Sequence, residues 1–137
     1  MILLDTHVIV WSAADDARLG PEARKTIAAC NSENPFHVSA ISAWELAMLV
    51  KKGRLDLGRP AGEWLTIASK HPAWRSLELD EPTALSAVNL PGELHPDPAD
   101  RFLIAAARVH GLAIMTADKA ILDYAKAGHV LAEDASR

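Results

Sequence analysis

The chain has 137 residues, of which 50% are hydrophobic and 23% are charged, and its formal net charge is −4 at pH 7. This length fits one domain, and the composition excludes a disordered tail and a membrane-spanning protein, since no apolar run approaches the ~18 residues needed to cross a bilayer. The negative charge excludes a protein that holds nucleic acid mainly through a basic surface. The single cysteine, Cys30, cannot form an intrachain disulfide, and the N-terminus lacks the basic flank of a signal peptide, so we expect a cytoplasmic protein.

The first stretch of the chain sets the expected architecture. Residues 2–4 are all apolar, which is typical of a short buried strand, and Asp5 follows them directly. A helical pattern then covers residues 6–14. Ligands of α/β domains bind outside the carboxyl ends of the strands, so we expect Asp5 at that edge, near the middle of the sheet. The alternative is that Asp5 only caps the helix that begins at Thr6.

Short apolar strands and helices alternate along the rest of the chain. The breakers and caps predict strands at 36–39, 74–79 and 112–115, with a last edge strand at 129–131. Helices are predicted to open at Pro21, to cover residues 43–50 and 82–89, to start at Pro60, to run from Asp97 to about residue 110, and to follow Asp118. The pattern predicts an α/β fold with a short central parallel sheet of four to five strands covered by helices on both faces.

Acidic residues recur where these strands end and helices begin. Asp5 and Asp118 come directly after buried strands, and Glu45 lies in the first turn of the helix after the second strand. Because strand ends and the following helix starts share one edge of the sheet, we expect these three to gather there. Asp97 and Asp100 share one face of a further helix start.

Each acid also has a purely structural interpretation. Ser42-x-x-Glu45 has the form of a capping box, and Asp97 before Pro98 has the form of an N-cap followed by a first-turn proline. Asp100 and Asp118 could simply favour helix dipoles, worth ~0.3–1 kcal/mol each. Together, however, several carboxylates on one edge repel unless a cation joins them, and oxygen ligands suit Mg²⁺ or Mn²⁺. The six histidines show no spacing typical of a zinc site.

Four pieces of the chain resemble the PIN-domain ribonucleases, specifically the VapC-like toxins of bacterial toxin–antitoxin pairs. They occur in the family's order and span nearly the whole chain, so the resemblance implies one PIN domain, a three-layer sandwich, over residues 1–137. In these toxins the third motif most commonly has Phe at the position where this chain has Ala99, which is a packing difference. The pieces are Leu3-Leu4-Asp5-Thr6-His7, Ser39-x-x-Ser42-x-Trp44-Glu45-Leu46, His95-x-Asp97-Pro98-x-Asp100-Arg101-x-Leu103-Ile104-Ala105-x-Ala107 and Thr116-x-Asp118.

The resemblance implies a function for each matching position. It implies Mg²⁺- or Mn²⁺-dependent endonucleolytic cleavage of RNA, with metal and catalytic roles for Asp5, Glu45, Asp100 and Asp118 and an accessory metal-binding role for Asp97. Supporting positions would hydrogen-bond the carboxylates or water, namely Thr6, Ser42 and Thr116, while Arg101 would steady the acids or contact the substrate phosphate. It also implies homodimers and a small antitoxin protein.

Basic and apolar surfaces extend this hypothesis. Lys51, Lys52 and Arg54 could guide RNA, although a basic helix end is also an ordinary solvated cap. Apolar side chains of two helices exceed what one small core needs, and we expect some of them to bind an amphipathic antitoxin helix: Trp11, Trp44, Met48 and Leu49, with Trp44 itself expected in the core. Two rival interpretations stay open: a non-catalytic binding protein of the same fold, and a metal-dependent phosphatase of a small substrate.

Overall fold

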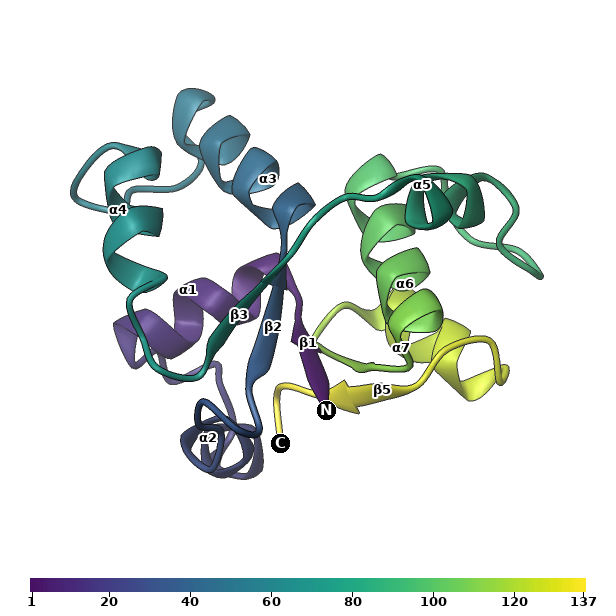
Figure 1. The fold of residues 1–137 in the computed structure, drawn as a ribbon, viewed down its shortest axis with the longest axis horizontal. Coiled ribbons are helices and arrows are strands. Elements are labelled where there is room, and N and C mark those ends of the chain that lie inside the picture. The colour runs from purple at the N-terminus through teal and green to yellow at the C-terminus, as the bar shows by residue number, and fades with distance from the viewer.

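A computed structural model describes all 137 residues, and it contains a five-stranded sheet surrounded by seven helices (Figure 1). The strands are β1 (Ile2–Leu4), β2 (Phe36–Ser39), β3 (Trp74–Leu77), β4 (Ala113–Thr116) and β5 (Ala132–Asp134). The helices are α1 (Thr6–Ala14), α2 (Pro21–Ala28), α3 (Ala40–Lys51), α4 (Ala61–Ala68), α5 (Glu81–Val88), α6 (Pro98–His110) and α7 (Lys119–Lys126). The α/β fold with a short parallel sheet is therefore confirmed.

The strand order β3-β2-β1-β4-β5 places β1 in the middle of the sheet, as the sequence predicts. Every neighbouring pair is parallel, so all five strands end at the same edge. The chain continues from β1 to β2 on one side of the sheet and later adds β4 on the other side of β1. The topological switch point therefore lies at the carboxyl ends of β1 and β4. Ligands of parallel α/β sheets bind in the crevice at such a point.

Each face of the sheet packs against its own hydrophobic core. Ile2 and Leu4 point into one cluster with residues of α1 and α2, while Leu3, between them, points into a second cluster with residues of α6 and α7. This alternation follows from the two-residue period of a strand. Because all three β1 side chains are buried, β1 is held firmly from both faces, and the residue that follows it has a fixed position.

The sequence predicts two of the observed helix caps, at Asp5 and Asp97, and Asp118 caps a third helix. Asp5, Asp97 and Asp118 each accept a hydrogen bond from a backbone N–H in the first turn of α1, α6 and α7. Gly111 ends α6 in the left-handed conformation, with φ of 66°. Capping and membership of a site are therefore compatible for these acids, because a carboxylate has about four lone-pair sites and a cap uses only one of them.

Three local predictions are wrong. The third helix begins at Ala40 rather than near residue 43, because Ser39 at the end of β2 already caps it by accepting from Ile41 N–H at 3.2 Å. The last strand is Ala132–Asp134 rather than 129–131, because His129 still bonds to the C-terminal turn of α7. Trp44 does not lie in the core, as the sequence analysis predicts, but on the outer face of α3 with 48% of its surface exposed.

The two ends of the chain lie close together at one side of the sheet (Figure 1). None of the helices is long and apolar enough to cross a membrane.

Candidate active site

Asp5 is the buried centre of the site. It follows β1 directly, and only 3% of its surface is exposed. Its Oδ1 accepts from Thr6 N–H at 2.7 Å, and its Oδ2 accepts from the Thr116 hydroxyl at 2.6 Å. Two short hydrogen bonds to a carboxylate compensate the loss of hydration that burial causes. Asp5 therefore keeps a fixed orientation toward the carboxyl edge of the sheet.

Asp118 occupies the equivalent place after the neighbouring strand β4. Its Oδ1 accepts from Ile121 N–H at 3.1 Å, which caps α7, and its own N–H donates to Thr116 Oγ1 at 2.9 Å. Because β1 and β4 pair directly, with Leu4 opposite Met115, the residues that follow them are neighbours as well. Thr116 thus connects Asp5 and Asp118 through one hydroxyl group.

The start of α6 brings two more carboxylates to this edge. Asp97 is exposed and caps the helix by accepting from Asp100 N–H at 3.1 Å. The side chain of Asp100 is only 15% exposed, and its Oδ2 lies 3.2 Å from Nε2 of His95. One oxygen each of Asp100 and Asp118 and a ring nitrogen of His95 all lie within 4.8 Å of one another, a spacing at which they could share one metal ion.

Glu45 reaches the site from α3, and the capping-box interpretation of this residue is wrong. Since α3 begins at Ala40, Glu45 lies in its second turn, and Ser42 is fully buried rather than exposed at a helix start. The Ser42 hydroxyl oxygen accepts from Thr6 Oγ1 at 3.0 Å, which ties α3 to α1. Burial raises the pKa of Glu45, and the negative charges of Asp5 and Asp97 add to this effect.

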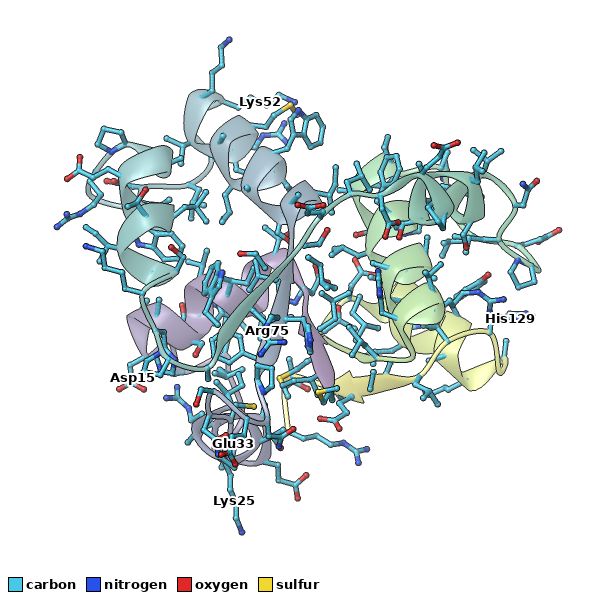
Figure 2. The ribbon with its side chains drawn as sticks, in the orientation of Figure 1. Asp15, Lys25, Glu33, Lys52, Arg75 and His129 are labelled. Carbon is cyan, nitrogen blue, oxygen red and sulfur yellow. The ribbon has the colours of Figure 1, made fainter.

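A single cavity of about 400 Å³ contains all five carboxylates. Apolar and basic side chains line it as well, among them Trp11, Leu49, Arg18 and Arg54. Lys51 and Lys52 are exposed and do not line it; Lys52 projects outward from the far end of α3 (Figure 2). Of the three predicted RNA-binding residues, the structure brings only Arg54 to the cavity.

The electrostatics of this cavity fit a bound cation. Burial, together with the charges of Asp5, Asp97, Asp118 and Glu45, raises the pKa of Asp100 to about 7. The basic groups closest to these acids are histidine rings alone: Nδ1 of His7 lies 3.6 Å from Asp5, and Nε2 of His95 lies near Asp100. Carboxylates that lack lysine or arginine partners repel one another, and a divalent cation with a preference for oxygen ligands would relieve this repulsion.

The Arg101 side chain contacts backbone carbonyl groups rather than the carboxylates. Its guanidinium donates to the backbone carbonyls of Ala87, Val88 and Leu94 at 3.0–3.5 Å. These contacts tie the end of α5 and the following loop to α6, so the side chain supports the fold rather than the carboxylates.

Sequence reasoning missed three side chains that line the cavity or contact its acids. His95 stands within the fragment His95-x-Asp97-Pro98-x-Asp100, so its proximity to these acids was a usable signal. His7, two residues after Asp5, and Arg18, in the loop after α1, line the cavity itself. The Arg18 guanidinium lies 4.9 Å from the centre of the Trp11 ring and pairs with Asp16, contacts that depend on a loop whose path no periodicity predicts.

Comparison with known proteins gives consistent results. The family model described as "PIN domain" matches residues 2–127. The chain is 36% identical over 118 residues to Ribonuclease VapC22 of Mycobacterium tuberculosis (strain ATCC 25618 / H37Rv), covering 86% of this chain and 87% of that one.

Solved structures share the same architecture. VapBC2 from Rickettsia felis, bound to a DNA fragment from its promoter, superimposes with a TM-score of 0.70 at 16% identity, covering 97% of this chain and 98% of that one. A toxin–antitoxin complex from Klebsiella pneumoniae gives a TM-score of 0.59 at 18% identity, covering 88% of this chain and 90% of that one. At such low identity, these structures establish likeness of fold alone.

Proposed function

The chain belongs to the PIN-domain family, and on this premise we propose that it is a Mg²⁺- or Mn²⁺-dependent endoribonuclease that acts as the toxin of a toxin–antitoxin pair. The observation that carries the proposal is the convergence of Asp5, Glu45, Asp97, Asp100 and Asp118 on one cavity. These residues come from four separate segments, so chance helix capping does not account for their meeting. A relative that is named a ribonuclease supports RNA as the substrate.

In this proposal the four principal acids, Asp5, Glu45, Asp100 and Asp118, hold the cation, and Asp97 and His95 lie close enough to assist. When bound, Mg²⁺ or Mn²⁺ supplies positive charge for the phosphate oxygens and activates a water nucleophile. Thr116 orients Asp5 and Asp118 through its two hydrogen bonds. The Thr6–Ser42 hydrogen bond keeps α1 and α3 together, which holds Glu45 at the same cavity.

RNA must approach a protein with a net charge of −4. Arg54 and Arg18 are exposed and line the same cavity as the acids. Cations that line this cavity could bind phosphates on either side of the one that is cleaved. We therefore assign substrate binding to Arg54 first, and we assign Lys51 and Lys52 only a long-range electrostatic role.

The antitoxin would bind beside α4. This helix has no buried residue, and cavities of about 320 and 410 Å³ flank it. The larger cavity is lined mainly by apolar side chains, including Phe36, Trp64 and Ile67. Ile67 and Trp44 are each 48% exposed, which suits an amphipathic helix that supplies apolar side chains at helical spacing. We also expect homodimers and a cytoplasmic location, which the single cysteine favours.

The experiment uses the purified full chain and a mixed pool of RNA. We expect internal cleavage with Mg²⁺ or Mn²⁺ and none with EDTA. Asp5→Asn should reduce the rate by orders of magnitude, whereas Asp123→Asn, an exposed carboxylate paired with Lys119, should cleave at the wild-type rate.

The same assay separates the rival functions. A non-catalytic binding protein would leave RNA intact under every condition. A phosphatase would release phosphate from p-nitrophenyl phosphate and leave internal RNA bonds uncut. Co-expression with the product of the adjacent gene tests the antitoxin: a stable complex that no longer cleaves RNA is expected.

A further inference from the structure

His7 lies next to Asp5 and also contacts the turn before Asp118, although it is not itself one of the acids. It lies in the first turn of α1, and its Nε2 accepts from the backbone N–H of Ala117 at 3.0 Å. Its Nδ1 lies 3.6 Å from Oδ2 of Asp5. A neutral imidazole has one donor nitrogen and one acceptor nitrogen, so acceptance at Nε2 puts the proton on Nδ1, on the side of Asp5.

The imidazole is held in this orientation by its neighbours. Its ring packs against Trp11, one helical turn further along α1, with ring centres 4.7 Å apart. The Arg18 guanidinium also lies against the Trp11 ring. His7 therefore has little freedom to rotate away from Ala117.

Ala117 lies between Thr116 and Asp118, in the turn that carries one of the principal acids. The N–H of Asp118 donates to Thr116 Oγ1, which itself donates to Asp5. The N–H of Ala117 donates to His7. Two consecutive N–H groups of this turn are thus both tied to the start of α1, one through Thr116 and the other through His7.

We propose that His7 is a positioning residue that fixes the turn of Ala117 against α1 and thereby sets the separation of Asp5 and Asp118 for a divalent cation. The proposal rests on the proposed function, since the cation belongs to the same site. Without a cation the two carboxylates repel each other, and the hydrogen bonds of the turn oppose this repulsion. Residues that orient metal ligands in this way typically contribute about 10–100-fold in metal affinity.

Two substitutions of similar size separate the contact with Ala117 from the rest of the side chain. In His7→Gln, the amide oxygen can reach the place of Nε2 and accept from Ala117 N–H. In His7→Asn, the amide is one methylene shorter and reaches only the place of Nδ1, next to Asp5. We expect His7→Asn to weaken Mn²⁺ binding by the full chain about 10–100-fold in calorimetric titration, and His7→Gln to stay within a few-fold of the wild type.

A second measurement does not depend on the metal. Hydrogen exchange of the Ala117 amide in the metal-free protein should be slow in the wild type and in His7→Gln, and fast in His7→Asn. His71 provides a control for the same substitution away from the site, because its ring packs against Phe36, outside the acidic cavity. His71→Asn should leave Mn²⁺ affinity unchanged.

The outcomes distinguish this proposal from the proposed function. Wild-type Mn²⁺ affinity in His7→Asn overturns the role of His7 while the metal site itself stands. An equal loss in His7→Gln and His7→Asn, with the Ala117 amide still protected in the glutamine variant, also overturns it. A wild-type protein that binds no Mn²⁺ overturns both proposals.

Discussion

The hydroxyl of Thr116 donates to Oδ2 of Asp5 at 2.6 Å, although the two residues are 111 positions apart in the chain. Parallel pairing of β1 with β4 makes this contact possible, because the two strands end side by side. The same hydroxyl oxygen accepts from Asp118 N–H. A fully buried threonine thus fixes two of the principal acids relative to each other.

Thr116→Val should therefore damage both stability and catalysis. The substitution leaves the buried Asp5 oxygen and the Asp118 N–H each without a partner, which costs about 1–3 kcal/mol of unfolding free energy. Thr83→Val is the matched control, because the Thr83 hydroxyl is also buried but has no hydrogen-bond partner. Removing it should leave stability unchanged or raise it. Urea unfolding measures both; equal destabilisation by the two substitutions would contradict the role given to Thr116.

The parts of the site that follow buried strands could be predicted from sequence. Residues 2–4 and 112–115 are short apolar runs, and an acid follows each after at most two residues. Parallel pairing then forces Asp5 and Asp118 together whatever the loops do. The start of α6 was also predictable, because Asp97-Pro98 is a strong helix-opening signal.

The remaining features depend on tertiary contacts that have no periodic signal. The sequence fragment places His95 near these acids, but the 3.2 Å approach of its ring to Asp100 depends on the path of the loop before α6. The helix α3 begins earlier than predicted because Ser39, at the end of the strand, caps it directly. The apolar pattern after residue 43 gives no sign of this earlier start. Trp44 looked like a core residue by composition, but the buried side of α3 carries Leu46 instead, and Trp44 is exposed.

The raised pKa of Asp100 predicts how the stability of the metal-free protein varies with pH. Burial and the neighbouring carboxylates raise this pKa from 3.8 to about 7, so between these values the folded state binds more protons than the unfolded chain. The resulting stabilisation is complete below the lower value and is lost as pH rises through about 7. In EDTA, Asp100→Asn should therefore melt a few degrees above the wild type at pH 8, with this advantage absent at pH 4.

The interpretation of Asp100 as a simple helix-dipole residue predicts the opposite sign. Removing a first-turn carboxylate would then destabilise by about 0.3–1 kcal/mol at pH 8, and Mn²⁺ would not affect melting. For a metal site, Mn²⁺ should raise the wild-type melting temperature, more at pH 8 than at pH 6, and should raise that of Asp100→Asn far less. Thermal melts of both proteins in EDTA and in Mn²⁺ decide between the two; a destabilised mutant and a metal-indifferent wild type would exclude the metal site.

Arg54 and Lys52 should differ in their effect on RNA cleavage. Arg54 lines the cavity, while Lys52 points away from it. We expect Arg54→Ala to raise KM for RNA several-fold and to reduce the salt dependence of kcat/KM, since one phosphate contact is lost. Lys52→Ala should change KM by less than about twofold at physiological salt, because its charge is screened. Equal effects would mean that RNA follows the end of α3 rather than the cavity wall.

Gly20 lies where the last residues of the chain cross the start of α2. Its N–H donates to Ala135 O at 2.9 Å, and Ala23 N–H donates to Arg137 O at 2.8 Å. A Cβ on Gly20 would lie only 2.1 Å from the carbonyl carbon of Arg137, which is backbone and cannot rotate away. Glycine is therefore required here because the C-terminal backbone approaches it closely. Its backbone conformation does not require glycine, since a φ of −71° is open to any amino acid.

Gly20→Ala should consequently displace residues 135–137 and lower the unfolding free energy by about 1–3 kcal/mol, as overpacking typically does. Gly62→Ala is the matched control: Gly62 lies within α4, and a Cβ there would meet nothing within 4 Å. Alanine in an exposed helix should stabilise by up to about 1 kcal/mol relative to glycine. The two substitutions add the same methyl group, so urea unfolding of both isolates the effect of the contact. If Gly20→Ala is as stable as the wild type, the terminal segment does not pack against α2 in solution.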